Sequence, residues 1–482
     1  MYSAIVFIYL SAIYTLRSTF LYLVYMKHAI DYAQKQSKRF EAELLTFLSI
    51  PSISTDEHRA LDVKEAANWL ANHIQDIGMS SVSVIPTAGH PIVFAEHKAE
   101  NPNAPTILFY GHYDVQPVDP IDLWVNPPFE PAIQDGKVYA RGATDDKGQV
   151  FIHIKAIESI LSQSPLPVNI KLLIEGEEEV GSPNLSPFVR ENTELLSCDA
   201  VVVSDTAMFA PGSPSLVVGL RGLAYIQIDV MGPNRDLHSG AYGGPVVNPL
   251  NALCQIIASL KDAKTGAIAI DGFYDKVLDI SDEERREFAS LGYNDSRLME
   301  DVQVKELGGE ENRTTLEKLW SRPTLDVNGI GGGYQAPGAK TVLPAKAMAK
   351  VSMRLVPNQT SAEIVTLIRA HIARVTPPGV RVTVTDLHGA NPVLVRRDVT
   401  AMHAAAQALS ETFGKQCVYQ REGGSIPVVE LFDNVLNVPT VLMGFGLSTE
   451  NLHSPNEHFH LENFHKGIEA AIRFYHLVGH VQ

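Results

Sequence analysis

Cysteine is scarce in this chain, and extended clusters of basic residues are missing. The 482 residues include only Cys198, Cys254 and Cys417, which are far apart and odd in number. This excludes a disulfide framework and a cysteine-type zinc site, and it favours a reducing compartment. Lys and Arg number 39 against 55 Asp and Glu, which gives a net charge of −16. Because nucleic acids are bound by clustered basic side chains, we expect no nucleic-acid partner.

The N-terminal segment 1–25 is almost uniformly apolar and is interrupted mainly by Arg17. It lacks the basic start and the small-residue cleavage site of a secretory signal. As a membrane span it is about long enough, but Arg17 would be costly at mid-membrane. Three interpretations remain: a mis-annotated start with Met26 as the true one, a membrane anchor, or a cleaved signal. We favour Met26, which predicts a cytoplasmic protein, with membrane contact only if the segment is a real anchor.

The order of the predicted elements indicates two domains, one inserted into the other. Length and a globular composition, with 45% hydrophobic and 20% charged residues, predict more than one core. Strand-like runs alternate with helices in the first part, which indicates an α/β layer. Residues 224–230 and 347–355 alternate with period two instead, as antiparallel strands do. We therefore expect an α/β catalytic domain over 26–218 and 391–482, with a mostly parallel sheet covered by helices on both faces, and an inserted α+β domain over 219–390.

Polar side chains follow the buried-type strand at 107–110, where it ends. His112 and Asp114 come directly after this apolar run, and their i, i+2 spacing keeps both on one side of an extended backbone. In open α/β sheets ligands bind beyond the strand ends, so these residues point to a site. Asp114 is placed to accept the second N–H of a metal-bound His112. A solitary His-x-Asp is usually a surface turn, so the prediction depends on the other strand ends.

Other strand ends and loops add further candidate ligands. Asp145 and Asp146 stand at a loop-to-helix junction, where Asp145 could bridge two cations or either residue could simply cap the helix. The carboxylates of residues 175–179 repel one another unless a cation binds them, and this acidic run starts directly after an apolar strand. Asp205 and His453 follow two more such runs, whereas His153 lies within a helix and is interpreted as structural. Two histidines and several carboxylates suit zinc, manganese or cobalt.

The ordered set of motifs resembles the dinuclear metallopeptidase family of cytosolic non-specific dipeptidase and carnosinase. This family is related to acetylornithine deacetylase, succinyl-diaminopimelate desuccinylase and glutamate carboxypeptidase. The resemblance runs from about residue 38 to the end and rests on these motifs in order: Gly111–Asp114, Arg141–Gly148, Glu175–Glu179, Ser204–Asp205, Asp236–Gly240, Arg354–Pro357, Arg421–Pro427 and His453–Ser454. Each motif is weak alone, but the ordered set is specific.

The resemblance implies a role for each matching residue. Asp145 would bridge two divalent metal ions, with His112 and Asp205 completing one site and Glu179 and His453 the other. Zinc is the expected metal, with manganese or cobalt as alternatives. The resemblance also implies a general base at Glu178 and a cis peptide bond between Asp145 and Asp146.

For the inserted domain, the resemblance implies a lid that is also a dimer interface. His238 would then reach the active site of the partner subunit of a homodimer and stabilise the oxyanion, and Arg354 would bind the substrate's terminal carboxylate. Thr341, Gly424 and Ser425 would line the same pocket.

The function that these residues predict is metal-dependent hydrolysis of dipeptides. Two cations would lower the pKa of a bridging water and polarise the scissile carbonyl, and Glu178 would move the proton from the water to the leaving amine. The nearest alternative is an N-acyl amino acid hydrolase of the deacetylase or desuccinylase type with the same metals. A non-catalytic scaffold that kept the fold is disfavoured by the complete set of ligands and base.

Overall fold

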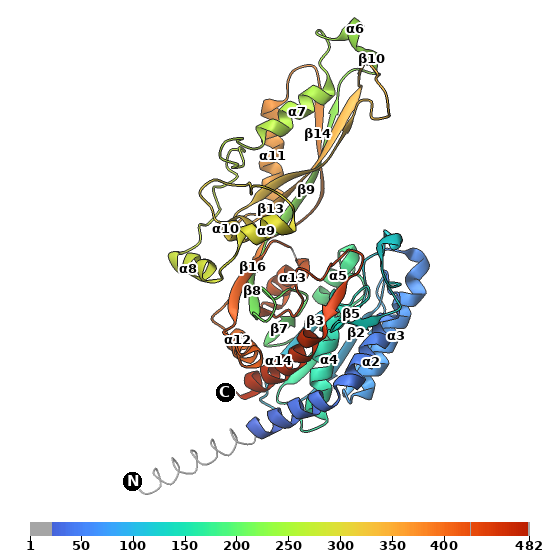
Figure 1. Cartoon of the computed structure of the whole chain (residues 1–482), viewed down its shortest axis with the longest axis vertical. Helices are drawn as coiled ribbons and strands as arrows, with labels where there is room; N and C mark the ends of the chain where they lie inside the picture. The colour runs from blue at the N-terminus through green and yellow to red at the C-terminus, as the bar shows by residue number, and fades with distance from the viewer. Residues whose placement is uncertain (1–21, 425, 481–482) are drawn as a thin grey trace. The chain divides into compact units, whose positions relative to one another are not determined.

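The structure is a computed structural model that describes residues 22–424 and 426–480. The chain folds into two compact units (Figure 1). The first runs to Val218 and also contains Val395–Tyr419 and the chain from Leu431 onward. The second contains Gly219–Leu394 and Gln420–Glu430. The chain leaves the first unit and later returns to it, so the second unit is an insertion.

Four adjacent parallel strands form the centre of the large sheet, in the order β6 (Asn169–Glu175), β3 (Thr106–His112), β7 (Ala200–Val203) and β17 (Thr440–Leu442). Antiparallel strands extend this centre: β2 (Ile92–His97) and β1 (Ser81–Ile85) beyond β6, and β8 (Ser215–Leu220) and β15 (Val393–Leu394) on the other side, where β16 (Val418–Glu422) also pairs with β8. Almost every residue of the four central strands is buried. A parallel centre is therefore flanked by antiparallel strands.

Helices cover both faces of this sheet, as the sequence predicts. Neighbouring residues of β3 point to opposite faces: the ring of Phe109 stacks on His153 of α4 (Lys147–Leu161), and Tyr110 packs on Phe432 of α13 (Pro427–Leu436). His153 is fully buried and hydrogen-bonded to Ser204 and Tyr475, in accord with its structural interpretation. Further helices of this unit are α2 (Ser37–Leu48), α3 (Ala60–Asp76), α5 (Leu185–Glu191), α12 (Thr400–Phe413) and α14 (Leu461–His480), with the short 3-10 turns η1 (Glu57–Arg59), η2 (Ile121–Leu123) and η3 (Glu178–Val180).

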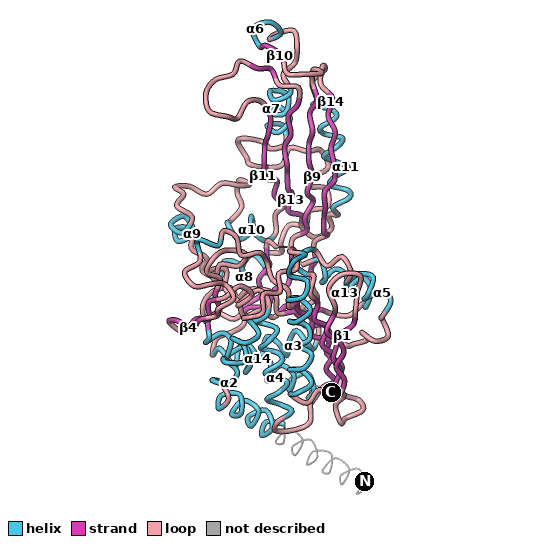
Figure 2. The backbone as a smooth tube through the Cα atoms, turned by 90° about the vertical axis from the view of Figure 1, so that its right-hand side faces the viewer, coloured by secondary structure: helices cyan, strands magenta, loops and turns pink. Residues whose placement is uncertain are grey.

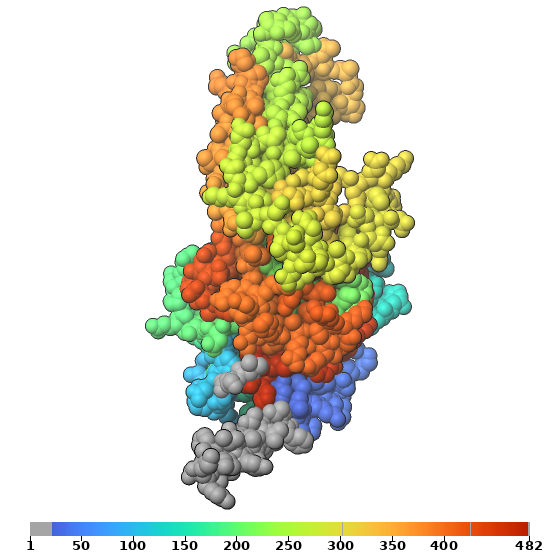
Figure 3. Space-filling view, turned by 90° about the vertical axis from the view of Figure 1, so that its left-hand side faces the viewer, coloured from blue at the N-terminus to red at the C-terminus, as the bar shows by residue number. Residues whose placement is uncertain are grey.

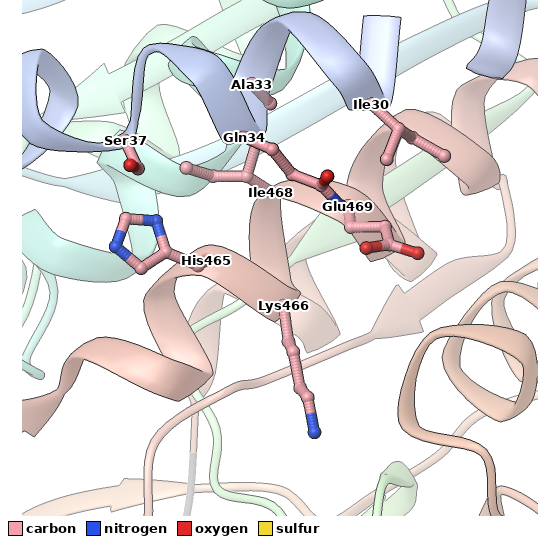
Figure 4. A pocket seen from close by; sticks show the side chains of 8 residues that line it. All are labelled: Ile30, Ala33, Gln34, Ser37, His465, Lys466, Ile468 and Glu469. Atoms are coloured by element: carbon pink, nitrogen blue, oxygen red, sulfur yellow. The ribbon is translucent and has the colours of Figure 1, made fainter.

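Residues 22–35 form a helix near the start of the described chain. Its buried side chains are Met26, Ala29, Ile30 and Ala33, which recur at three- and four-residue intervals as on one face of an amphipathic helix. A groove of about 320 Å³ lies between this end of the chain and α14 (Figure 4). The apolar segment predicted over 1–25 lies mostly outside the described residues. Among the described helices, none is long and apolar enough to span a membrane.

The second unit is built on a four-stranded antiparallel sheet in the order β11 (Thr324–Gly332), β13 (Lys346–Leu355), β9 (Gly222–Met231) and β14 (Arg381–Ala390), drawn side by side in Figure 2. The alternating runs at 224–230 and 347–355 are strands, as predicted. Their buried residues pack with those of α7 (Pro249–Ser259) and α11 (Ser361–Val375) in one core. The unit therefore buries one face of its sheet under two helices.

Short elements complete the second unit. These are β10 (Leu237–His238) paired with β12 (Val342–Leu343), α6 (Ser239–Tyr242), α8 (Asp282–Ser290), α9 (Asp295–Asp301) and α10 (Thr315–Trp320). Residues 261–322, with their three short helices, form a broad surface of this unit, coloured yellow-green to yellow in Figure 3. A separate small sheet in the first unit joins β4 (Ala132–Gln134), β5 (Lys137–Tyr139) and β18 (His458–His460).

Candidate metal centre

The candidate ligands of the first unit lie at the carboxyl ends of the parallel strands and in the adjoining loops. His112 is the last residue of β3, and Asp205 stands two residues beyond the end of β7. Glu179 lies in η3, just after β6, and Asp145 precedes α4. His453 lies between β17 and β18. Because the carboxyl ends of parallel strands meet at one edge of the sheet, the fold gathers these residues from distant parts of the sequence.

The first cluster consists of His112, Asp145 and Asp205, whose ligand atoms all lie within 4.8 Å of one another. His112 Nε2 is 3.1 Å from Asp145 Oδ1. On its other side, His112 Nδ1 is 3.0 Å from the carbonyl oxygen of Asp114 and 3.3 Å from its carboxylate Oδ1. The contact predicted between His112 and Asp114 is therefore present, and it fixes which nitrogen faces Asp145.

The second cluster consists of Asp145, Glu179 and His453, again with ligand atoms within 4.8 Å of one another. His453 Nε2 is 2.8 Å from Asp145 Oδ2 and 3.5 Å from Glu179 Oε2. Gln116 Nε2 donates a hydrogen bond of 2.7 Å to Glu179 Oε2. Asp145 thus directs one carboxylate oxygen toward each cluster, which is what a ligand shared by two cations requires.

Two local features bring Asp145 and Asp146 to this position. The peptide bond between them is cis, which confirms the geometry that the family resemblance implies. Asp146 Oδ2 accepts a hydrogen bond of 3.3 Å from the backbone N–H of His112. A Cβ at Gly111 would lie 2.8 Å from that same oxygen, so only glycine permits the approach. Asp146 therefore ties the loop of Asp145 to the end of β3.

The charge run at 175–179 divides into separate roles. Glu175 accepts hydrogen bonds from Tyr110 (2.5 Å) and Ser182 (2.8 Å). Glu177 accepts bonds from Asn184 Nδ2 and from the backbone N–H of His90. These two carboxylates are held by protein donors, which corrects the expectation that a cation collects the whole run. Of the two residues that follow, Glu179 belongs to the second cluster, and Glu178 interacts electrostatically with Asp205 and Asp145.

Asp114 also holds the backbone of the turn that carries the candidate base. Its Oδ1 accepts from the N–H of Glu178 at 3.2 Å, and its Oδ2 accepts from the N–H of Glu179 at 3.1 Å. Asp114 is fully buried, so these bonds are shielded from water. One carboxylate thus links His112 to η3, and with it the first cluster to the second.

The acidic groups of the centre repel one another in the absence of a cation. Burial, followed by repulsion from Asp145, raises the pKa of Asp205 to about 6 and that of Glu179 to about 10. Burial also raises the pKa of Glu178 to about 8. Burial opposes the charged form of His112, but its hydrogen bonds to Asp114 and Asp145 outweigh this and raise its pKa well above the usual value.

The residues present fit divalent cations. Two imidazoles and three carboxylates offer the nitrogen and oxygen donors that zinc, manganese and cobalt accept. Among the described residues, Glu179 Oε1 and Asp146 Oδ1 are buried without a hydrogen-bond partner. Such orphaned oxygens are costly in a protein interior unless a positive charge lies beside them. A third cluster, Glu43, His73 and Glu158, differs because Lys155 Nζ already lies 2.5 to 2.7 Å from all three.

The residues predicted to bind substrate belong to the second unit. Arg354 is half-buried near the end of β13, between Leu223 of β9 and Thr324 of β11. His238 and Thr341 are exposed, and the N–H of Gly240 donates to His238 Nδ1. Gly424 is exposed, and Ser425 lies outside the described residues. The structure therefore brings together the metal candidates, Asp114 and Glu178 within one unit, whereas the substrate candidates lie in the other.

Sequence reasoning missed several residues that support the centre. Gln116 follows the His112 motif directly, but an amide in a loop carries no chemical signature. Glu450 and Glu457 are buried and accept hydrogen bonds from the loop of Asp145, which begins at Arg141. The one signal in the sequence was the position of Glu457, a carboxylate between the candidate ligand His453 and the short strand at 458–460.

Known proteins resemble this chain over most of its length. Residues 108–476 match Peptidase family M20/M25/M40. The Cys-Gly metallodipeptidase dug1 of Schizosaccharomyces pombe is 32% identical over 458 residues, which cover 92% of this chain and 96% of the relative. The crystal structure of human carnosine dipeptidase 1 superposes with a TM-score of 0.81 at 28% identity, covering 94% of this chain and 98% of that one. An M20 family metallo-carboxypeptidase, Sso-CP2 of Sulfolobus solfataricus, gives a TM-score of 0.81 at 34% identity, with coverages of 91% and 99%.

Proposed function

Because this chain belongs to Peptidase family M20/M25/M40 and is thus a hydrolase of the metallopeptidase class, we propose that it hydrolyses dipeptides at a centre of two divalent cations. The observation that carries the proposal is the pair of clusters that share Asp145, one oxygen directed to each. Relatives over nearly the full length include a Cys-Gly metallodipeptidase and a carnosine dipeptidase. Their names support a dipeptide as the substrate.

Five residues would hold the cations. His112 and Asp205 would complete one site, Glu179 and His453 the other, and Asp145 would serve both. Zinc is our first choice for this donor set, and manganese or cobalt would also suit it. When bound, the cations would supply a water of lowered pKa as the nucleophile and polarise the scissile carbonyl. No serine or cysteine nucleophile is then needed.

Glu178 would act as the general base. It precedes the ligand Glu179, and Asp114 accepts a hydrogen bond from its backbone N–H, which supports a role for its carboxylate beside the ligands. It would take the proton of the attacking water and return it to the leaving amine. Asp114 would contribute indirectly, by orienting both His112 and the turn that carries Glu178.

The second unit would recognise the substrate and complete the site in a homodimer. Arg354 would bind the free carboxylate of the dipeptide in a bidentate geometry that lysine cannot reproduce. Thr341, Gly424 and Ser425 would line the same pocket. His238 of the partner subunit would stabilise the oxyanion. The exposure of His238 on a short strand supports a contact outside its own unit. We also infer a cytoplasmic location, which the three free cysteines support.

A substrate panel tests this function against its nearest alternative. The panel contains Ala- and Gly-containing dipeptides, Cys-Gly, the same dipeptides amidated at the C-terminus, a tripeptide, and N-acetyl and N-succinyl amino acids. We expect the free dipeptides to be cleaved, with loss of activity on chelation and recovery with Zn²⁺, Mn²⁺ or Co²⁺. Cleavage restricted to N-acyl amino acids would replace the dipeptidase proposal with an acyl amino acid hydrolase.

The amidated dipeptides test the role of Arg354. Arg354→Lys should lose far more kcat/KM on a free dipeptide than on its amide, because only the free substrate offers a carboxylate to the guanidinium. Equal losses of kcat/KM on the free and the amidated dipeptide would show that Arg354 supports the structure of its unit and does not bind the carboxylate. The wild-type enzyme should itself prefer the free dipeptide to the amide.

A further inference from the structure

Two buried glutamates that the proposed reaction does not use lie close to the metal ligands in sequence. Glu450 precedes His453 by three residues, and Glu457 follows it by four. Both side chains are fully buried, at 0% exposure. A buried carboxylate is costly unless donors satisfy it, so the partners of these two glutamates indicate what they hold in place.

Glu457 is satisfied entirely by the loop that ends in Asp145. Its Oε2 accepts hydrogen bonds from Arg141 Nη1 at 2.7 Å and from the N–H of Gly142 at 3.0 Å. Its Oε1 accepts from the N–H of Thr144 at 3.0 Å and from the N–H of Asp145 at 3.1 Å. All four donors come from residues 141–145. The backbone of the shared ligand is therefore held by one carboxylate.

The same glutamate belongs to the segment that carries His453. That histidine has a left-handed backbone, with φ of 57°, and its side chain is 55% exposed. No strand or helix contains it. Its position relative to Asp145 is thus set by contacts between the two loops, and Glu457 supplies four hydrogen bonds to that junction.

Glu450 closes the His453 segment on itself. Its Oε1 accepts from the N–H of His460 at 3.0 Å and lies 2.6 Å from His460 Nδ1. Its Oε2 accepts from the N–H of Leu447 at 2.7 Å and from Thr144 Oγ1 at 3.1 Å. Three of these four contacts of Glu450 lie within the His453 segment and one reaches Thr144, whereas all four hydrogen bonds of Glu457 come from the loop that ends in Asp145.

We propose that Glu457 is a positioning residue that holds Asp145 and His453 at the spacing required by the cation of the second cluster. The inference rests on the proposed metal-dependent function and extends it to a residue that touches neither cation nor substrate. His112 and Asp205 are anchored independently of Glu457, at the ends of β3 and β7. Loss of Glu457 should therefore weaken the second cation more than the first.

The test is stepwise metal binding by the full-length Glu457→Gln variant. Glutamine has nearly the same shape, but its NH₂ group cannot accept, so whichever way it points it faces two donors. We expect Zn²⁺ to bind to the second cluster at least about tenfold more weakly than in the wild-type protein, as is typical when a residue that orients metal ligands is replaced. The affinity of the first cluster should change less. Calorimetric titration of the metal-free protein measures both steps, and Co²⁺ absorption reports the coordination of each.

A matched control separates positioning from general stability. Glu310 accepts two hydrogen bonds from Arg322 in the second unit, at 2.8 and 2.7 Å, so Glu310→Gln also breaks a bidentate arginine pair. This variant should keep both metal affinities. Thermal unfolding of the two metal-free variants shows whether the loss of folding stability is similar.

The outcomes distinguish this inference from the proposed function. Unchanged affinities in Glu457→Gln, or equal losses at both steps, would overturn the positioning role. A wild-type protein that binds no divalent cation would instead refute the proposed function itself. If Glu457→Gln does not fold, Glu457→Asp keeps the charge but shortens the reach, and it should again weaken the second step more than the first.

Discussion

The two clusters that share Asp145 differ in what anchors them. In the first, His112 is the last residue of β3 and Asp205 follows β7, and these neighbouring parallel strands are paired as far as Tyr110 and Val203. In the second, Glu179 lies in a 3-10 turn and His453 in a loop, and side-chain contacts fix their positions. The side chain of His112 is 0% exposed and that of His453 is 55% exposed.

This difference predicts unequal cation sites. Ligands placed by strands are held more precisely than ligands placed by loops. The first cluster should therefore be preformed and bind its cation tightly, whereas the second should bind more weakly and exchange its cation faster. Substitutions of Asp145, which is common to both sites, and of residues that belong to only one site test this asymmetry.

Replacement of Asp145 should have the largest effect, because it removes a ligand from both clusters at once. We expect Asp145→Ala to retain neither cation at micromolar metal and to have no measurable activity. Metal analysis after gel filtration measures this. A variant that retained two cations would show that the bridge lies elsewhere, with the buried Asp146 as the next candidate.

Glu178→Gln is the control for this result, since Glu178 acts on the water and not on the cations. It should bind two metals per chain and still lose about 10²- to 10⁴-fold in kcat, the usual range for a general base. Loss of both metals from Glu178→Gln would contradict the assignment of the base.

The two histidines test the asymmetry directly. His453→Ala should retain one cation with nearly wild-type affinity, because the ligands at the strand ends are intact. His112→Ala should retain at most one weakly held cation, because only the loop cluster is complete. Equilibrium dialysis of both variants gives the two affinities. Equal affinities for the remaining cation would refute the claim that anchoring by strands strengthens the first site.

The dependence of the two affinities on pH should also differ. A cation must displace protons from groups that are protonated in the metal-free protein, so affinity rises with pH below their raised pKa values. Between pH 6.5 and 8.0 Asp205, with a pKa of about 6, is mostly ionised, whereas Glu179, with a pKa of about 10, is still protonated. A hydrogen bond to Asp145 also raises the pKa of His453.

The second cation must therefore displace the proton of Glu179, and the raised pKa of His453 adds to this cost, whereas the first cation meets a raised pKa mainly at His112. We expect the second affinity to increase more steeply over this range. Titrations at pH 6.5 and 8.0 in two buffers with different ionisation enthalpies measure the protons released at each step. An equal release at both steps would contradict the expectation.

The same contrast explains which parts of the site could be predicted from sequence. A continuous apolar run leads to His112, and another leads to Asp205. The change from apolar to polar residues at the end of each run is local in the sequence, and it indicates both candidate ligands. The apolar spacing of Val63, Ala66, Leu70 and Ile74 indicates helix α3 for a similar reason, because this pattern too is local. Features encoded within a single element are thus readable from sequence.

The supporting contacts of the second cluster were not predictable in this way. Glu457 bonds to Asp145 across 312 positions of the sequence, and nothing local in residues 453–457 indicates that partner. Likewise, repulsion within the acidic run did not reveal that Tyr110 and Ser182 satisfy Glu175. The antiparallel direction of the strands that flank the parallel centre was not predicted, because strand direction depends on the fold as a whole.

The smallest expected effect concerns Gln116, which contacts only the second cluster. Its amide donates one hydrogen bond of 2.7 Å to Glu179 Oε2, and the side chain is half-buried. Methionine has a similar length but no N–H donor, so Gln116→Met removes this bond with little change in volume. With the cation bound Glu179 is ionised, and a hydrogen bond to a charged group is worth about 1.5–3 kcal/mol; the same bond to protonated Glu179 in the metal-free protein reduces the net effect on affinity.

We therefore expect the second cation to bind up to about tenfold more weakly in Gln116→Met, with the first affinity unchanged. Saturating metal should restore kcat, since the change affects occupancy and leaves Glu178 in place. Stepwise titration and the metal dependence of kcat measure these quantities. If the second affinity is unchanged, Asp114 alone positions the turn of Glu179 through its backbone N–H, and the second cluster is more strongly anchored than its loops suggest.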